Sequence, residues 1–251
     1  MTEKAVEIRK LNYTYPDGKR ALHDIELDVF TGESVGIIGP NGAGKSTLLL
    51  HLNGILRGNG HVRIFDLEIN DKNLTRIRRM VGLVFQDPDN QLFMPTVFDD
   101  VSFGPINMNI PKNEVENLVN EALKEVDMLD SIGRSSHHLS FGEKKRISIA
   151  TVLSMKPQIL ALDEPSSNLD PKHRRDLIGF LGRSKLTKII VTHDLDLVSK
   201  ICSKVILIDK GRIIASGNTS DILKDKSLLE AHDLEMICSF SQEKAPISFI
   251  D

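Results

Sequence analysis

The segment GPNGAGKST, residues 39–47, constrains the fold of this chain more than any other part of the sequence. It matches the pattern G-x-x-x-x-G-K-[S/T], follows the apolar run SVGII and precedes the helix-forming stretch TLLLHLNGIL. Glycines let a backbone wrap closely around a phosphate, so that successive N–H groups and a helix N-terminus point at the anion. A plain glycine-rich turn is the alternative, but this strand–loop–helix setting favours a phosphate-binding loop.

Short runs rich in Val and Ile alternate with helix-length segments, which predicts an α/β fold with a largely parallel sheet. Residues 6–27 instead alternate apolar and polar side chains around a Pro-Asp-Gly turn, as antiparallel strands do, and residues 211–217 are typical of another hairpin. The clearest runs for the parallel sheet are 34–38, 80–85, 158–162, 188–192 and 204–209.

Between Asp87 and Met155 the apolar spacing becomes helical, which predicts a helical lobe inserted into the sheet domain. The 251 residues suit one domain of this kind, and a net charge of −3 gives no general sign of nucleic-acid binding. No signal sequence or membrane-length apolar run is found, so we expect a cytosolic chain unless a partner holds it at a membrane.

Two adjacent carboxylates, Asp163 and Glu164, end the buried-type run ILALDEP. Two adjacent carboxylates repel each other, and a cation bound between or beside them would relieve that repulsion. The alternative interpretation is a surface turn. We assign Asp163 and the Ser46 hydroxyl to Mg²⁺, and Glu164 to the general base that polarises the attacking water. Lys45 supplies positive charge to the β- and γ-phosphates.

Gln86 and His193 each follow a β-run directly. Taken singly, an ordinary solvated glutamine and a satisfied loop histidine would be adequate interpretations. Ligands of parallel sheets bind beyond the carboxyl ends of the strands, however, so we expect both to converge with Lys45 and Glu164 on one site.

The segment LSFGEKKR opens a helix at residue 140. Ser140 stands at the N-cap position with Glu143 three residues later, which is a capping-box pattern. A capped amphipathic helix explains these residues, but Ser140 and the Gly142 N–H also form a potential anion site. For a phosphate already bound by the Lys45 loop, this second anion site would have to come from elsewhere.

Together, the phosphate loop, LSFGEKKR, ILALDEP, SSNLD and VTHD stand in the order and spacing of ABC ATPases, and this resemblance covers about residues 6–223. It implies a P-loop NTPase fold with a mostly parallel RecA-like sheet, an N-terminal antiparallel β-subdomain and an inserted helical subdomain. The expected divisions are 1–86 with 156–231 for the core and β-subdomain, 87–155 for the helical subdomain and 232–251 for a C-terminal extension.

The resemblance also implies roles for individual residues. Two subunits would sandwich ATP and Mg²⁺, with Tyr15 stacking on adenine, unless that ring is an ordinary core or surface aromatic. His193 would sense the γ-phosphate, and Gln86 would join the metal site and link it to a transmembrane partner. The implied ATP-binding loop is Gly39, Pro40, Asn41, Gly42, Ala43, Gly44, Lys45, Ser46 and Thr47; the residues facing the partner's ATP are Ser140, Phe141, Gly142 and Glu143; and those at the dimer seam are Asn168 and Asp170.

Residues 81–105 are most similar to the energy-coupling-factor type of ABC ATPase, and the signature variant is similar to the cobalt/nickel branch. This implies uptake of cobalt or nickel ions or a vitamin, at the cytoplasmic face of a membrane. The implied partners are a second ATPase subunit, a transmembrane coupling protein and a substrate-binding membrane subunit, with no nucleic acid. Apolar residues within 92–98 form either part of a groove for the coupling protein or ordinary lobe core.

Phe141 and Glu143 depart from the commoner LSGGQ signature, and Glu143 places a carboxylate near a phosphate site. It must turn back to its helix N-terminus or meet the basic residues at 144–146. Three alternative functions remain. A DNA-repair ATPase would need a long coiled coil, a ribosome-associated ABC protein would normally have a second phosphate loop, and a small-molecule kinase would not need LSFGEKKR.

Overall fold

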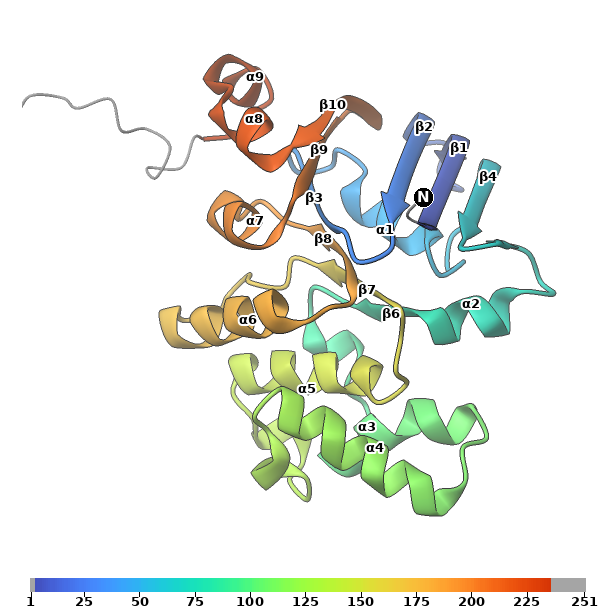
Figure 1. The fold of residues 1–251 in the computed structure, drawn as a ribbon, viewed down its shortest axis with the longest axis vertical. Helices are drawn as coiled ribbons and strands as arrows, with labels where there is room; N and C mark the ends of the chain where they lie inside the picture. The colour runs from blue at the N-terminus through green and yellow to red at the C-terminus, as the bar shows by residue number, and fades with distance from the viewer. Residues whose placement is uncertain (1–2, 236–251) are drawn as a thin grey trace, which may run out of the picture.

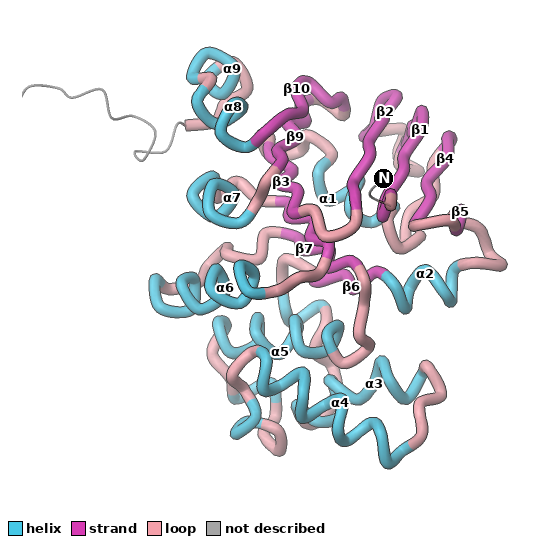
Figure 2. The backbone as a smooth tube through the Cα atoms, viewed as in Figure 1, coloured by secondary structure: helices cyan, strands magenta, loops and turns pink. Residues whose placement is uncertain are grey.

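The computed structural model describes residues 3–235, in which two β-sheets and several helical layers are arranged as Figures 1 and 2 show. The first sheet is antiparallel and has the strand order β2-β1-β4-β5. Its strands are β1 (Lys4–Thr14), β2 (Arg20–Phe30), β4 (Asn59–Ile64) and β5 (Leu67–Glu68). The β1–β2 hairpin turns at Pro16-Asp17-Gly18, as the alternating pattern predicted.

The second sheet has the order β10-β9-β3-β8-β7-β6 and is parallel except for the hairpin strand β10 at its edge. Its strands are β3 (Ser34–Ile38), β6 (Val81–Val84), β7 (Ile159–Asp163), β8 (Thr187–Val191), β9 (Lys204–Asp209) and β10 (Arg212–Asn218). The predicted run 80–85 was a residue too long at each end, and the two predicted for β7 and β8 were shifted by one residue. The fold class and the other strands are as predicted, but β4 and β5 were not predicted, because β4 is mostly exposed and β5 has only two residues.

Both faces of the parallel sheet are buried, which is why its strands read as continuous apolar runs. In β7, Ile159 and Ala161 pack with the antiparallel sheet and α1 (Lys45–His51). Leu160 and Leu162 pack into the other core, with the helices of the opposite layer. The sheet therefore separates two apolar cores and fixes the position of both layers.

The chain between β6 and β7 is helical and forms the lower layer of Figure 1. Its main helices are α3 (Val97–Asn107), α4 (Lys112–Glu125) and α5 (Phe141–Leu153), with short 3-10 turns at Pro88–Asn90, Leu129–Ser131 and Ser136–His138. The 3.6-residue spacing predicted this lobe. Whether it is a separate subdomain with the boundaries 87 and 155 stays a prediction.

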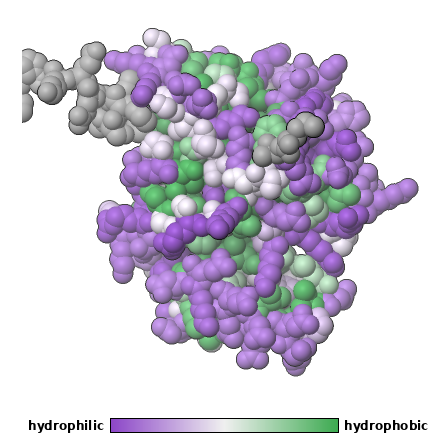
Figure 3. Space-filling view, viewed as in Figure 1, coloured by the Kyte–Doolittle hydropathy of each residue, from purple (hydrophilic) through white to green (hydrophobic). Residues whose placement is uncertain are grey.

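Three of the remaining helices connect strands of the sheets, and two follow β10 at the end of the described chain. They are α2 (Leu74–Met80), α6 (Pro171–Arg183), α7 (Leu195–Ile201), α8 (Thr219–Lys224) and α9 (Lys226–Glu230). Of the C-terminal extension expected at 232–251, residues 236–251 lie outside the described part. No helix within residues 3–235 has the length and apolar character needed to cross a membrane. The face in Figure 3 is largely hydrophilic, with apolar side chains visible only in small patches.

Candidate nucleotide site

The phosphate loop connects the buried strand β3 to helix α1, and two of its glycines have no room for a side chain. Gly39 has φ 144°, and a Cβ there would lie 1.9 Å from the Ile208 carbonyl oxygen. Gly44 has φ 103°, and its Cβ would lie 2.6 Å from the Ala21 carbonyl oxygen. Glycine is therefore required at both positions by backbone conformation and by close approach of other strands.

Lys45, the first residue of α1, lies inside this loop. Its Nζ donates to the carbonyl oxygens of Gly39 (2.7 Å) and Pro40 (2.9 Å), and the side chain is buried. Burial lowers the pKa of Lys45, while the carboxylates of Glu164 and Asp163 oppose that shift. A cation held at the mouth of a ring of backbone N–H groups makes the loop an anion site.

A cavity of about 820 Å³ lies beside the loop. The side chains of Lys45, Gln86, Glu164 and His193 all line it, so the strand ends converge as the sequence predicted. Tyr15 and Asp233 also line the cavity. Sequence reasoning missed four of the lining residues, because neither a motif nor a pattern marks them: Lys19, Ala21, Asp233 and Leu234.

Asp163 and Glu164 end strand β7 in different environments. Ser46 Oγ donates to Asp163 Oδ1 at 3.0 Å, and burial raises the pKa of Asp163 although this hydrogen bond lowers it. Glu164 Oε2 accepts from Thr192 Oγ1 at 3.0 Å and lies 2.9 Å from His193 Nδ1. Glu164 itself has φ 42°, an uncommon conformation for a residue with a side chain and one found at functional sites.

These residues suit Mg²⁺. The hydroxyl of Ser46 and the carboxylate of Asp163 are adjacent hard oxygen donors, and the amide oxygen of Gln86 is available on the same cavity. Mg²⁺ prefers such oxygens and keeps several waters or phosphate oxygens besides one or two protein ligands.

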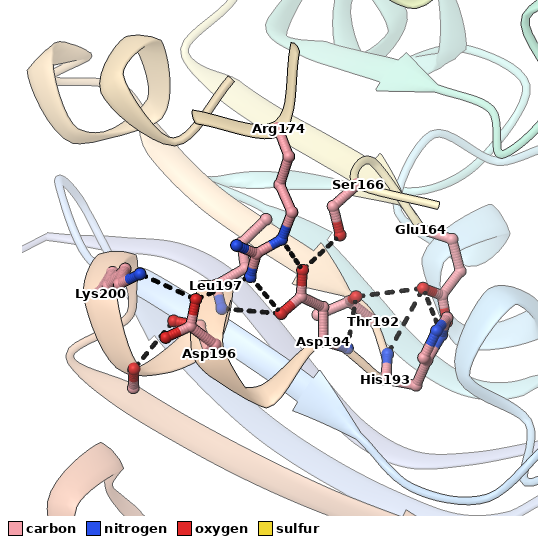
Figure 4. Close-up of polar contacts among 10 residues, drawn as sticks. Glu164, Ser166, Arg174, Thr192, His193, Asp194, Asp196, Leu197 and Lys200 are labelled. Carbon is pink, nitrogen blue, oxygen red and sulfur yellow. Dashed lines mark hydrogen bonds and ion pairs between the residues drawn. The ribbon is translucent and has the colours of Figure 1, made fainter. Parts of the chain in front are cut away.

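A polar network behind His193 was not predicted from the sequence (Figure 4). Arg174 on α6 binds Asp194 through two hydrogen bonds of 2.7 and 2.8 Å and also reaches Asp196. Ser166 donates to the same Asp194 carboxylate at 2.9 Å. Burial alone would raise the pKa of Asp194, but Arg174 and the other donors lower it overall. The network joins the loops that follow β7 and β8, and thereby fixes the backbone beside His193.

The signature residues begin helix α5 on a different surface. Ser140 Oγ accepts from the Glu143 N–H, and Glu143 Oε2 accepts from the Ser140 N–H at 2.7 Å, so the predicted capping box is present. These hydrogen bonds lower the pKa of Glu143, and Arg134 lies 3.5 Å from its other oxygen. Glu143 thus turns back to its own helix. Among the described residues that line the cavity, none comes from 140–143.

Lys145 on the same helix is a further residue without a sequence signal. It is 1% exposed, and its Nζ donates to the carbonyl oxygens of Phe85 (3.0 Å) and Gln86 (2.7 Å). Burial lowers the pKa of Lys145 to about 8. This side chain ties the signature helix to the backbone of Gln86, whose own side chain is exposed in the cavity.

The residues predicted at a dimer seam lie on the loop after β7. Asn168 is exposed, has φ 58° and lines a shallow hollow together with Asp194. Asp170 is also exposed and caps helix α6 by accepting from the N–H groups of Lys172 and His173. Asp170 Oδ2 lies 2.6 Å from His173 Nδ1, and the His173 ring packs over Gly142. This contact brings the seam loop and the signature helix together.

The predicted apolar cluster at 92–98 divides between core and surface. Leu92 and Val97 are buried, and Phe98 packs against the same core. Phe93 is 62% exposed and lies edge-on to Phe103, with ring centroids 5.1 Å apart, in a surface groove that also includes Ile55. Asp100 holds this loop, since its Oδ1 accepts from the Phe93 and Met94 N–H groups.

Comparison with known proteins shows the family of this chain. A family model described as ABC transporter matches residues 22–167. A putative ABC transporter ATP-binding protein of Geobacter sulfurreducens is 51% identical over 236 residues, covering 94% of this chain and 95% of its own. The energy-coupling factor transporter ATP-binding protein EcfA of Carboxydothermus hydrogenoformans is 48% identical over 235 residues, covering 92% of this chain and 87% of its own.

Solved structures give the same result. CbiO1 from Clostridium perfringens, described as part of the ABC transporter complex CbiONQ, superimposes with a TM-score of 0.81 at 39% identity, covering 91% of this chain and 94% of its own. A dimeric post-hydrolysis state of the ATP-binding cassette MJ0796, bound to ADP and Pi, has a TM-score of 0.78 at 27% identity and covers 85% of this chain and 98% of its own.

Proposed function

Because this chain belongs to the ABC transporter family of ATP-binding subunits, which hydrolyse ATP to drive transport, we propose that the cavity beside α1 is its Mg·ATP site and that it powers uptake of a small solute. The observation that carries this proposal is the convergence of Lys45, Gln86, Glu164 and His193 on one cavity next to the phosphate loop. A cation, a carboxylate base and a histidine around one phosphate site are the groups that phosphoryl transfer to water requires.

Lys45 and the loop N–H groups bind the β- and γ-phosphates and neutralise charge that grows in the transition state. Glu164 is the general base: its buried Oε2 already accepts from Thr192 and the His193 backbone, which holds the carboxylate in one orientation. His193, which follows the neighbouring parallel strand β8, contacts the γ-phosphate. The Asp194–Arg174 network keeps its backbone in place.

Ser46, Asp163 and Gln86 would hold Mg²⁺. When bound, this ion would neutralise negative charge on the phosphates. Tyr15 also lines the cavity and provides a ring for the adenine base. The rest of the phosphate loop, from Gly39 to Thr47, binds through backbone and hydroxyl groups.

A second ATPase subunit would complete the site. Ser140, Phe141, Gly142 and Glu143 lie away from the cavity on their own chain, which supports a role toward nucleotide held by a partner. Glu143 does not oppose this role, because its charge is committed to its own helix N-terminus. Asn168 and Asp170, both exposed on the seam loop, would lie between the two subunits.

The exposed groove with Phe93, Phe103 and Ile55 would receive a cytoplasmic helix of a transmembrane coupling protein. Lys145 links the signature helix to Gln86, and Gln91 near the groove donates to α5, so groove and site share a continuous set of contacts. The similarity to EcfA and CbiO1 favours an energy-coupling-factor complex, with cobalt or nickel ions or a vitamin as the solute bound by a separate membrane subunit. The chain would then act at the cytoplasmic face of the membrane.

Lys45→Ala tests the nucleotide site directly. Removing the ammonium should weaken ATP binding and abolish hydrolysis, because nothing else in the loop carries a full positive charge. Lys156→Ala, which removes a lysine that does not line the cavity and has 66% of its side chain exposed, is the matched control and should keep hydrolysis. ATP binding by calorimetry and phosphate release would be measured, and wild-type turnover in Lys45→Ala would refute the assignment.

A further inference from the structure

Tyr15 is one member of a closed ring of side-chain contacts. Its hydroxyl lies 2.9 Å from Thr47 Oγ1, and its ring is edge-on to Tyr13 at a centroid distance of 5.0 Å. Tyr13 is in turn edge-on to His51 at 4.9 Å, and His51 Nδ1 lies 2.7 Å from the Thr47 carbonyl oxygen. These contacts return to their starting point, so none of the side chains can turn without disturbing a neighbour.

The ring joins two elements with different tasks. Tyr13 is on strand β1, and Tyr15 follows directly after its end. Thr47 and His51 are one turn apart on helix α1, which begins at Lys45 of the phosphate loop. The helix end that holds phosphates is thus connected to the Tyr15 ring, which lines the same cavity.

His51 fixes the buried side of this ring. It is 1% exposed, and because a carbonyl can only accept, its Nδ1 is the donor to Thr47. Burial lowers the pKa of His51, which keeps the imidazole neutral, and no partner is found for Nε2 within residues 3–235. A buried histidine with an unsatisfied nitrogen is costly for stability alone, which suggests that its position serves the site.

We infer that Tyr13 and His51 are positioning residues that set the distance and orientation of the Tyr15 ring relative to the phosphate loop, and so select nucleotides over base-free polyphosphates. The inference rests on the proposed nucleotide site. Neither side chain lines the cavity itself. Both act through Tyr15 and Thr47, which do.

The test compares ATP with tripolyphosphate, each with Mg²⁺, as ligands of the full chain. Tyr13→Leu and His51→Leu remove the edge-on contacts, and each should weaken ATP binding by about three- to ten-fold, the equivalent of one aromatic pair. Tripolyphosphate affinity should not change. Tyr13→Phe keeps the ring and should bind both ligands as the wild type does. His61→Leu, a histidine on β4 with 71% of its side chain exposed, is the matched control.

The sequence supplies a second readout. The chain has two tyrosines and no tryptophan, so its intrinsic emission comes from Tyr13 and Tyr15. ATP should change this emission in the wild type and tripolyphosphate should change it much less. The change on ATP binding should be reduced in His51→Leu, where both tyrosines remain but the ring of contacts is open. Thermal unfolding identifies any variant that fails to fold. If His51→Leu does not fold, comparing the ATP affinities of Tyr13→Leu and Tyr13→Phe still tests the role of the Tyr13 ring.

Two results would overturn the inference. If Tyr13→Leu and His51→Leu bind ATP as well as His61→Leu, the contacts have no role in binding. If tripolyphosphate affinity falls as much as ATP affinity, the ring supports the phosphate loop and not the base. A wild-type protein with equal affinity for both ligands would instead refute the base-binding role of Tyr15 in the proposed function.

Discussion

At the scale of a single residue, Glu164 gives the most direct test of the proposed mechanism. The Glu164 side chain is 10% exposed. Its carboxylate accepts a hydrogen bond from the Thr192 hydroxyl and lies 2.9 Å from His193 Nδ1. Glu164→Gln keeps the size and can hold a water, but it cannot take its proton. We expect ATP binding to survive while hydrolysis falls by about 10²–10⁴.

Single-turnover phosphate release and calorimetric ATP binding would measure these two effects separately. Glu121→Gln is a suitable control, because Glu121 lies on α4 with 61% of its side chain exposed and lines neither the cavity nor the signature. A loss of ATP binding equal to the loss of hydrolysis in Glu164→Gln would mean that this residue organises the site and is not its base.

At the scale of an element, helix α5 carries an unusual buried lysine. Burial lowers the pKa of Lys145 to about 8, against 10.5 in the unfolded chain. Between these values the unfolded state binds more protons, so this group makes the folded state more stable as pH rises. A neutral amine still has two N–H donors for the Phe85 and Gln86 carbonyls. The stability margin of the wild type over Lys145→Met should therefore grow as pH rises from about 8 toward 10.5.

Denaturant unfolding of both proteins across that pH range would measure the margin. Lys156→Met, which removes a lysine with 66% of its side chain exposed, controls for the loss of a surface charge. A margin that stays constant or shrinks with pH would contradict the buried, readily neutralised state of Lys145.

At the scale of the whole molecule, the proposed function requires two subunits. If the signature residues bind the γ-phosphate of a partner's ATP, unhydrolysed ATP links the protomers. Glu164→Gln should then form a stable dimer with Mg·ATP and not with ADP. Adding Ser140→Arg should abolish this dimer but leave ATP binding intact, because Ser140 does not line its own chain's cavity. Size-exclusion chromatography with light scattering would decide, and a normal dimer of the double variant would contradict the sandwich.

The groove with Phe93, Phe103 and Ile55 gives a separate prediction. Phe93→Ser should reduce transport by the reconstituted complex while leaving the basal ATPase of the isolated subunit unchanged, because Phe93 is 62% exposed and away from the cavity. Leu228→Ser, at a partly buried apolar position on α9, is the matched control for losing an apolar side chain elsewhere. Equal losses of transport and basal ATPase in Phe93→Ser would count against a coupling surface.

The sequence by itself determined the phosphate loop, the fold class, every strand except β4 and β5, and the capping box of α5. Each depends on interactions within a few residues: glycine conformation at Gly39 and Gly44, alternating or continuous apolar runs, and the reach of Ser140 to Glu143. It also brought Gln86, Glu164 and His193 to one edge, because the carboxyl ends of parallel strands must meet there.

Only the tertiary structure decided which side chains support that site. Arg174 reaches Asp194 across 20 residues, Lys145 reaches Gln86 across 59, and Tyr15 reaches Thr47 across 32. From the sequence alone, Arg174 is an ordinary arginine of a helix and Lys145 is one lysine of a basic run. Tyr15 is an aromatic residue that could equally belong to a core, a surface or a binding site. Their contacts depend on how helices and strands distant in the chain pack against one another, and no local pattern encodes that arrangement.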